Sequence, residues 1–183
     1  MDVKPPARRV DEVFDEVLVL YAQDGRREAL ERLASRWRPR HYAHARRLLG
    51  SGDGAADAVQ DAWVGIVRGL WRLKDPSRFA GWSYAIVTRR CQDQLRRRLR
   101  AAETPLDEAA EPVAPAKNDG VQEVTARLAA LPSEQRAAVA LYYLDGFTVA
   151  EIAAALAVPV GTVKTRLFHA RRTLRRALTG DDS

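Results

Sequence analysis

The chain has 183 residues with a formal net charge of +6, and 46% of its residues are hydrophobic and 30% charged. This composition excludes a disordered or fibrous protein and allows one domain or two small ones. The single cysteine, Cys91, excludes an internal disulfide, and the positive charge favours a polyanionic partner, either nucleic acid or an acidic membrane surface. With no apolar run long enough to span a bilayer and no signal-peptide pattern, we expect a cytoplasmic protein without membrane insertion.

The first hundred residues carry apolar side chains at the spacing of amphipathic helices. The pattern predicts helices over residues 11–24, 26–49, 55–72 and 78–100. We expect Pro39 to bend or restart the second helix because proline lacks a backbone N–H, and Asp53 to cap the third. Together these helices predict one helical domain over residues 11–100.

Residues 101–120 differ in character, with three prolines, many alanines and several acidic residues but no helical stripe. We interpret them as an acidic, Pro/Ala-rich linker, followed by a second helical domain over residues 121–178. In that domain Pro132 and Ser133 open a helix whose apolar side is expected to include Val139, Tyr142 and Tyr143. The predicted fold is all-α: two small helical domains joined by a flexible linker, the C-terminal one a helix-turn-helix.

The helix-turn-helix pattern begins at Thr148 and Glu151, which have the spacing of a capping box. Pro159 is expected to stop that first short helix, and Gly161 opens a second one. The apolar stripe of the second helix comprises Val163, Leu167, Ala170, Leu174 and Leu178. Its other face is basic, with Lys164, Arg166, His169, Arg171, Arg172, Arg175 and Arg176.

A basic helix held by a preceding helix has the geometry that enters a DNA major groove. Lys164 and Arg166 lie near the start of the helix and are expected closest to base edges. The arginines further along the helix are expected to contact phosphates. The alternative to DNA binding is that the apolar stripe merely builds a helical bundle.

The helix over residues 78–100 joins aromatic residues to a run of arginines. Single-stranded DNA needs this pairing, since arginines follow the backbone while an aromatic ring offers a stacking surface. Trp82 and Tyr84 are the candidate stacking residues, although either could be a core residue and the arginines a solvated face. In the preceding helix, Asp57 and Asp61 lie one turn apart beside Gln60, forming either a docking surface for a basic partner or a solvated acidic patch.

The sequence contains no arrangement of residues that predicts catalysis, a metal site or a cofactor. His41 and His44 are spaced to share a metal, but no Cys or acidic ligand completes a site, so we interpret them as surface or core histidines. Cys91 lies beside Arg89 and Arg90, which suggests either a reactive thiol or, as we favour, a small buried filler.

Four motifs in this order resemble the extracytoplasmic-function (ECF) subgroup of bacterial RNA polymerase sigma factors. They are Ala56-Asp-Ala-Val-Gln-Asp61, Phe79-Ala-Gly-Trp82 running to Asp93-Gln-Leu-Arg-Arg97, Leu131-Pro132, and Glu151-Ile-Ala153 with Val158-Pro-Val-Gly-Thr-Val-Lys-Thr-Arg-Leu167. The chain departs from the family at Ser83 and Arg89, where the family often has Leu and Asn, and this predicts an unusual promoter.

The resemblance implies a transcription initiation factor without enzymatic activity or cofactor. Its partners would be core RNA polymerase, at the clamp coiled coil and the flap, then promoter DNA and an anti-sigma factor. The implied polymerase-binding residues are Asp57, Gln60 and Asp61. The implied −10 and DNA-melting residues are Trp82, Tyr84, Arg89, Arg90, Arg96 and Arg97. The implied −35 residues are Thr162, Lys164, Thr165, Arg166, His169, Arg171 and Arg172.

Two other functions fit parts of the same pattern. A stand-alone helix-turn-helix regulator would bind duplex DNA tightly without polymerase. A basic peripheral membrane protein would use the arginine-rich helix on anionic lipids.

Overall fold

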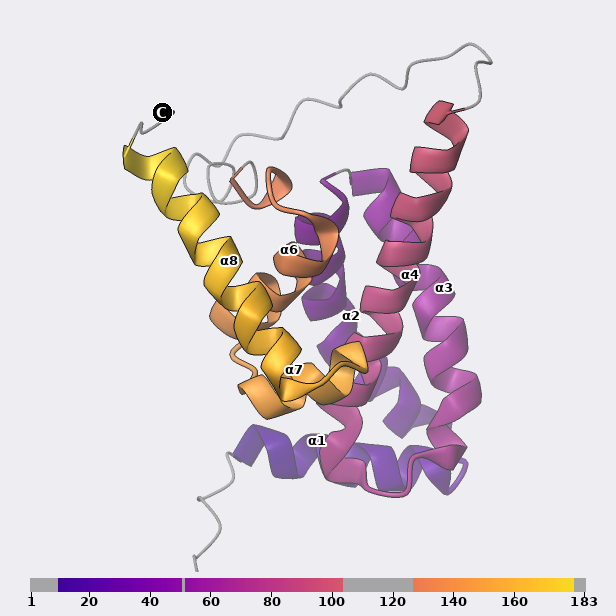
Figure 1. Ribbon diagram of the computed structural model, residues 1–183. Helices are drawn as coiled ribbons and strands as arrows, with labels where there is room; N and C mark the ends of the chain where they lie inside the picture. Colours follow the sequence, from indigo (N-terminus) through magenta and orange to yellow (C-terminus); the bar gives the residue numbers. More distant parts are fainter. Residues whose placement is uncertain (1–9, 51, 104–126, 180–183) are drawn as a thin grey trace, which may run out of the picture.

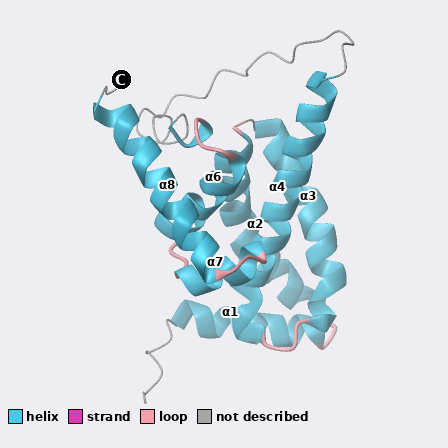
Figure 2. Ribbon diagram, in the orientation of Figure 1, coloured by secondary structure: helices cyan, strands magenta, loops and turns pink. Residues whose placement is uncertain are grey.

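The computed structural model describes residues 10–50, 52–103 and 127–179, and these residues are helical with short connections (Figures 1 and 2). The chain folds into two small helical domains, as the sequence predicts. The N-terminal helices are α1 (Val10–Gln23), α2 (Arg27–Leu49), α3 (Gly52–Gly69) and α4 (Phe79–Glu103). The C-terminal elements are α6 (Ser133–Val139), the π-helical turn η3 (Ala140–Leu144), α7 (Val149–Leu156) and α8 (Val160–Thr179).

The N-terminal domain packs α2, α3 and α4 side by side, and α1 crosses one end of them (Figure 1). Its centre is apolar, with Leu33, Trp37, Ile66, Phe79 and Val87 all buried. Within the described part of the chain, no helix is long and apolar enough to cross a membrane.

Two details of these helices differ from the prediction. Pro39 does not restart α2, which continues from Arg27 to Leu49. Pro39 leaves the Ser35 carbonyl without an N–H partner, and both residues lie on the exposed side of α2, where proline is tolerated more readily than in a core. α3 begins at Gly52, so Asp53 lies within the helix and not at the position before it.

The connection between α3 and α4 contains two short 3-10 turns, η1 (Leu70–Arg72) and η2 (Pro76–Arg78). Asp75 caps the second turn, accepting a hydrogen bond from the Ser77 N–H at 3.1 Å. At the end of α3, a Cβ on Gly69 would lie 2.9 Å from Cζ2 of Trp82. Glycine therefore allows α3 to approach the start of α4 closely.

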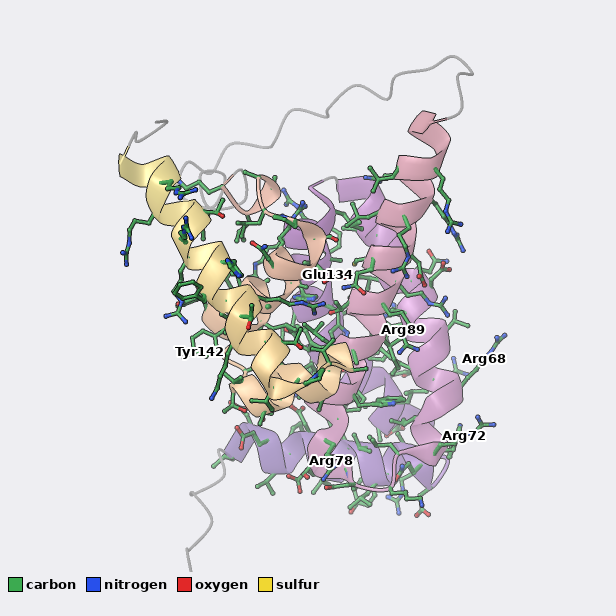
Figure 3. All side chains as sticks on the ribbon, viewed as in Figure 1. Arg68, Arg72, Arg78, Arg89, Glu134 and Tyr142 are labelled. Atoms are coloured by element: carbon green, nitrogen blue, oxygen red, sulfur yellow. The ribbon has the colours of Figure 1, made fainter. Side chains whose placement is uncertain are left out.

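The C-terminal domain packs α6, α7 and α8 around Leu131, Leu141, Ile152 and Leu167, which are all buried. The structure describes this domain from residue 127, so residues 121–126 lie outside the described residues. Tyr142 and Tyr143 were expected on the apolar side of the next helix, but both are exposed, and Figure 3 labels Tyr142. The π-helical turn η3 changes the helical phase, so the positions after Leu141 no longer continue the buried stripe of α6.

The C-terminal domain packs against the N-terminal one, with α7 lying along α4 and η3 meeting α2. In Figure 1, α7 lies across the α2–α4 layer while α8 leans away from it. The face of α8 that is turned away from α6 and α7 is therefore open.

Candidate nucleic-acid and polymerase interfaces

The helix-turn-helix begins with the predicted capping box. Thr148 Oγ1 accepts from the Glu151 N–H at 3.3 Å, and the Glu151 carboxylate accepts from the Thr148 N–H at 2.7 Å. The first helix ends at Leu156, and Ala157, not Pro159, stops it by adopting a left-handed conformation with φ 54°. Pro159 belongs to the start of the next helix instead, where its carbonyl accepts from the N–H groups of Thr162 and Val163.

The second helix, α8, has the two faces that its sequence predicts. Val163, Leu167 and Ala170 are buried against α6 and α7, and Leu174 is half-buried. Five of the predicted DNA-binding residues are exposed on the other side: Lys164, Thr165, His169, Arg171 and Arg172. Thr162 is half-buried near the helix start. The exposed side combines positive charge with hydroxyl and imidazole groups, which can donate to phosphates and base edges.

Arg166 does not project freely from this face. Its guanidinium donates to the carboxylate of Glu134 on α6, and its side chain is only 17% exposed. Figure 3 labels Glu134 on α6. A base contact by Arg166 would require it to exchange Glu134 for the base.

Phe168 is a feature of this surface that the sequence reasoning missed. It is 61% exposed, in the middle of the basic face, with its ring edge-on to His169 at 5.5 Å between centroids. An exposed phenylalanine can contact the methyl group of thymine in the major groove. The sequence could have predicted this exposure, since Phe168 lies outside the apolar stripe, between Leu167 and Ala170, and among basic residues.

On α4, the structure places Tyr84 in the core, the alternative that the sequence left open. Tyr84 is 4% exposed and packs against Trp37, His41 and His44 of α2, so no base can stack on it in this arrangement of the two domains. Burial, followed by the nearby charge of Asp145, raises the pKa of Tyr84 and keeps its hydroxyl protonated. Trp82 is half-buried and rests near Gly69.

The predicted arginines of α4 are exposed, but they do not form one surface. Arg90 and Arg97 line a hollow between α3 and α4 together with Asp57, Gln60 and Asp61. We call these five residues, with Ala58, Asp93 and Gln94, the α3–α4 hollow. Arg96 pairs with Asp93, and Arg89 is exposed near the middle of α4 (Figure 3). The structure thus brings together the acids predicted to bind polymerase and two of the arginines predicted to bind DNA.

Ser83, which departs from the family pattern, has a clear role in the core. It is buried beside His41, whose Nε2 lies 3.1 Å from Ser83 Oγ. His44 is buried as well, so both histidines are core residues. Among the described residues, no cluster of His, Cys, Asp and Glu could hold a metal ion.

Cys91 is buried, and its burial raises the pKa of the thiol to about 12, as expected for a small residue that fills space in the core.

Comparison with known proteins decides what these surfaces belong to. The chain matches the family model for sigma-70 region 2 over residues 33–101 and the model for sigma-70 region 4 over residues 122–174. It is 35% identical over 156 residues to the ECF RNA polymerase sigma factor SigM of Mycobacterium tuberculosis, a match covering 84% of this chain and 79% of that protein. The chain belongs to the ECF RNA polymerase sigma factors.

Solved structures of sigma factors share its fold. CnrH, in complex with the cytosolic domain of CnrY, aligns with a TM-score of 0.69 and 26% identity over 92% of this chain and 99% of CnrH. RpoE from Bartonella quintana, in complex with the anti-sigma factor NepR, aligns with a TM-score of 0.67 and 25% identity over 84% of this chain and 98% of RpoE. As a sigma factor with regions 2 and 4, this protein acts with RNA polymerase and directs transcription initiation at promoters rather than catalysing a reaction.

Proposed function

We propose that α8 is the −35 reader of this sigma factor. The observation that supports this role is the exposed basic face of a helix held by a capped preceding helix. The residues that we assign to −35 contacts are Thr162, Lys164, Thr165, Arg166, His169, Arg171 and Arg172. Lys164 and Thr165 lie in the first turns and suit base edges, whereas Arg171 and Arg172 lie further along and suit phosphates.

We assign the −10 element and strand separation to α4, through Trp82, Arg89, Arg90, Arg96 and Arg97. Arg89 lies outside the α3–α4 hollow, which makes it suited to the DNA backbone. Arg96 also lies outside the hollow, but it pairs with Asp93, so its positive charge is partly balanced. Arg90 and Arg97 lie beside acidic side chains, so their positive charge is partly balanced and their contribution to DNA binding should be smaller.

Core polymerase is proposed to dock on Asp57, Gln60 and Asp61. All three side chains are exposed on one side of α3, and their acidity suits a basic partner surface such as the clamp coiled coil. The corresponding domain assignment is residues 11–100 for polymerase and −10 binding, 101–120 for a linker and 121–178 for −35 binding at the flap. The protein would act in the cytoplasm, where its polymerase and promoter partners are found.

An anti-sigma factor is proposed as a further partner. The support is that RpoE from Bartonella quintana was solved in complex with the anti-sigma factor NepR, and that it shares this fold over most of its length.

In vitro transcription tests the complete proposal. Core polymerase with this protein should produce run-off transcripts from a cognate promoter selected among genomic fragments, while either component alone should not. Tight sequence-specific binding of duplex DNA by the isolated protein, at about 10 nM or below, without any polymerase-dependent transcript would instead identify a stand-alone regulator.

A further inference from the structure

Asp145, in the loop that leads into α7, has its carboxylate buried between the two domains. Oδ2 accepts from His44 Nδ1 at 2.8 Å, and Oδ1 accepts from Arg47 Nη1 at 2.9 Å and from the Tyr84 hydroxyl at 3.2 Å. These three donors come from α2 and α4 of the N-terminal domain, whereas Asp145 belongs to the C-terminal one. The side chain of Asp145 is only 6% exposed, so hydrogen bonds from the N-terminal domain take the place of almost all of its contact with water.

The surroundings of Asp145 keep it charged. Burial alone would raise its pKa, but the hydrogen bond and charge of His44, followed by those of Arg47, outweigh burial and hold the pKa of Asp145 below its ordinary value. A buried carboxylate without donors is strongly unfavourable, so the hydrogen bonds and the domain contact depend on each other.

Phe147 forms the second contact of the same loop. Its ring lies 4.9 Å from the ring of Tyr84, edge-on, and its Cε1 lies 3.9 Å from the position that a Cβ on Gly81 would take. Gly146, between the two contact residues, has φ 75°, a left-handed conformation that favours glycine. We call Asp145, Gly146 and Phe147 the latch loop.

Arg136 provides a separate tie between the domains. From α6, its Nη1 donates to the carbonyl of Leu48 at the end of α2 at 2.6 Å. The closed contact is therefore attached to α2 at three residues, His44, Arg47 and Leu48, in addition to the packing of α7 along α4.

A closed chain cannot serve both promoter elements at once. The −10 and −35 positions are about 25 base pairs apart, which corresponds to about 85 Å of duplex. α4, at 25 residues, is only about 37 Å long, and a compact chain of this size has a radius of gyration of about 16 Å. The chain between Glu103 and Arg127 has a contour length of about 80 Å, which permits the two domains to separate.

We propose that the latch loop holds the free protein in a closed resting state, with the −35 domain fastened to α2 and α4. Polymerase binds the open state, so the closed contact lowers the apparent affinity of the protein for core polymerase. Asp145 is the central residue of this device, because its carboxylate accepts three hydrogen bonds across the interface and its charge strengthens them.

Substitutions on both sides of the contact test the proposal with the full-length protein. Asp145→Asn keeps the shape of the side chain but removes its charge, and Arg47→Gln removes the guanidinium from the other side. We expect each variant to show a larger radius of gyration by small-angle X-ray scattering and about tenfold tighter binding to core polymerase. The double variant should add little to either single variant because both break the same contact. Asp24→Asn and Arg46→Gln are matched controls on exposed residues and should behave as wild type.

Two results would overturn the proposal. In the first, both variants keep wild-type dimensions and wild-type affinity for polymerase. In the second, they expand but bind polymerase more weakly, which would place the closed contact in the polymerase-bound form. If circular dichroism shows that Asp145→Asn loses helix, Arg47→Gln decides the question from the N-terminal side. Failure of the wild-type protein to bind core polymerase would count against the sigma-factor function itself, a distinguishable outcome.

Discussion

His41 gives the sharpest quantitative prediction. Its Nε2 lies 3.1 Å from Ser83 Oγ, and the Ser83 hydroxyl already donates to the carbonyl of Ala80 at 3.0 Å. His41 must therefore donate through Nε2, which leaves Nδ1 as a buried acceptor without a partner among the described residues. A second proton on Nδ1 would find no acceptor. Burial and then the neighbouring His44 lower the pKa of His41 from its ordinary 6.5 to about 3.

The pKa difference makes the folded protein sensitive to mild acid. As the pH falls below about 6.5, His41 becomes protonated in the unfolded chain but stays neutral in the folded protein. The contribution of His41 to stability is therefore complete above about pH 6.5 and is lost progressively towards pH 3. With these two pKa values, the free energy of unfolding should fall by about 2 kcal/mol between about pH 8 and about pH 5 because of this residue alone.

Urea denaturation at the two pH values, followed by circular dichroism, measures this loss. In His41→Gln the side chain keeps an N–H for Ser83 but cannot titrate, so its free energy of unfolding should fall by about 2 kcal/mol less than that of the wild type. His169→Gln, at an exposed histidine on α8, is the matched control and should keep the wild-type pH dependence. Equal pH dependence in the wild type and His41→Gln would refute the reasoning.

Four further substitutions test the proposed surfaces and the packing. Asp61→Arg should abolish co-purification with core polymerase while leaving the helical circular dichroism unchanged, and undiminished co-purification would exclude the docking role. Arg166→Ala should weaken binding to the cognate −35 sequence by ~1–3 kcal/mol, whereas equal weakening on all promoters would identify a phosphate contact. Phe168→Ala should weaken the same binding by about 1 kcal/mol, and replacing thymine with uracil in the −35 element should weaken the wild type but not this variant. Gly69→Ala should destabilise the fold by ~1–3 kcal/mol in denaturant titrations because its Cβ would meet Trp82, and an unchanged midpoint would show that Trp82 moves aside.

The features that were predictable from sequence depend on local spacing. The capping box at Thr148 and Glu151 and the buried stripe of α8 follow from contacts within one or two helical turns, and both are present. The residue that stops α7 was not predictable in this way, because the left-handed conformation of Ala157 depends on the turn as a whole and not on the preference of alanine.

The features that escaped prediction depend on partners far away in the sequence. Tyr84 looks like a stacking residue next to its arginines, yet its hydroxyl bonds Asp145, 61 positions further along. Asp145 precedes Gly146 in a pair that is typical of a helix end, whereas its donors His44 and Arg47 lie 101 and 98 positions away. Helical periodicity reports which side of a helix is apolar, but it does not report which polar groups meet when two domains pack.

The domain contact contains a buried polar cluster, which fits a contact that must open. It joins the apolar packing of α7 along α4, and of Phe147 on Tyr84, to an aspartate with three polar donors. When the contact opens, water hydrogen-bonds to Asp145, Arg47 and the Tyr84 hydroxyl in place of their mutual contacts. The net free energy of the ion pair is therefore small compared with its Coulomb attraction. An apolar contact of the same size would lose its hydrophobic stabilisation without compensation. Replacing Asp145 and Arg47 together with leucine should therefore close the protein more firmly and weaken its binding to core polymerase, the opposite of Asp145→Asn. Tighter polymerase binding by the leucine pair would show that the interface is held by the ion pair alone.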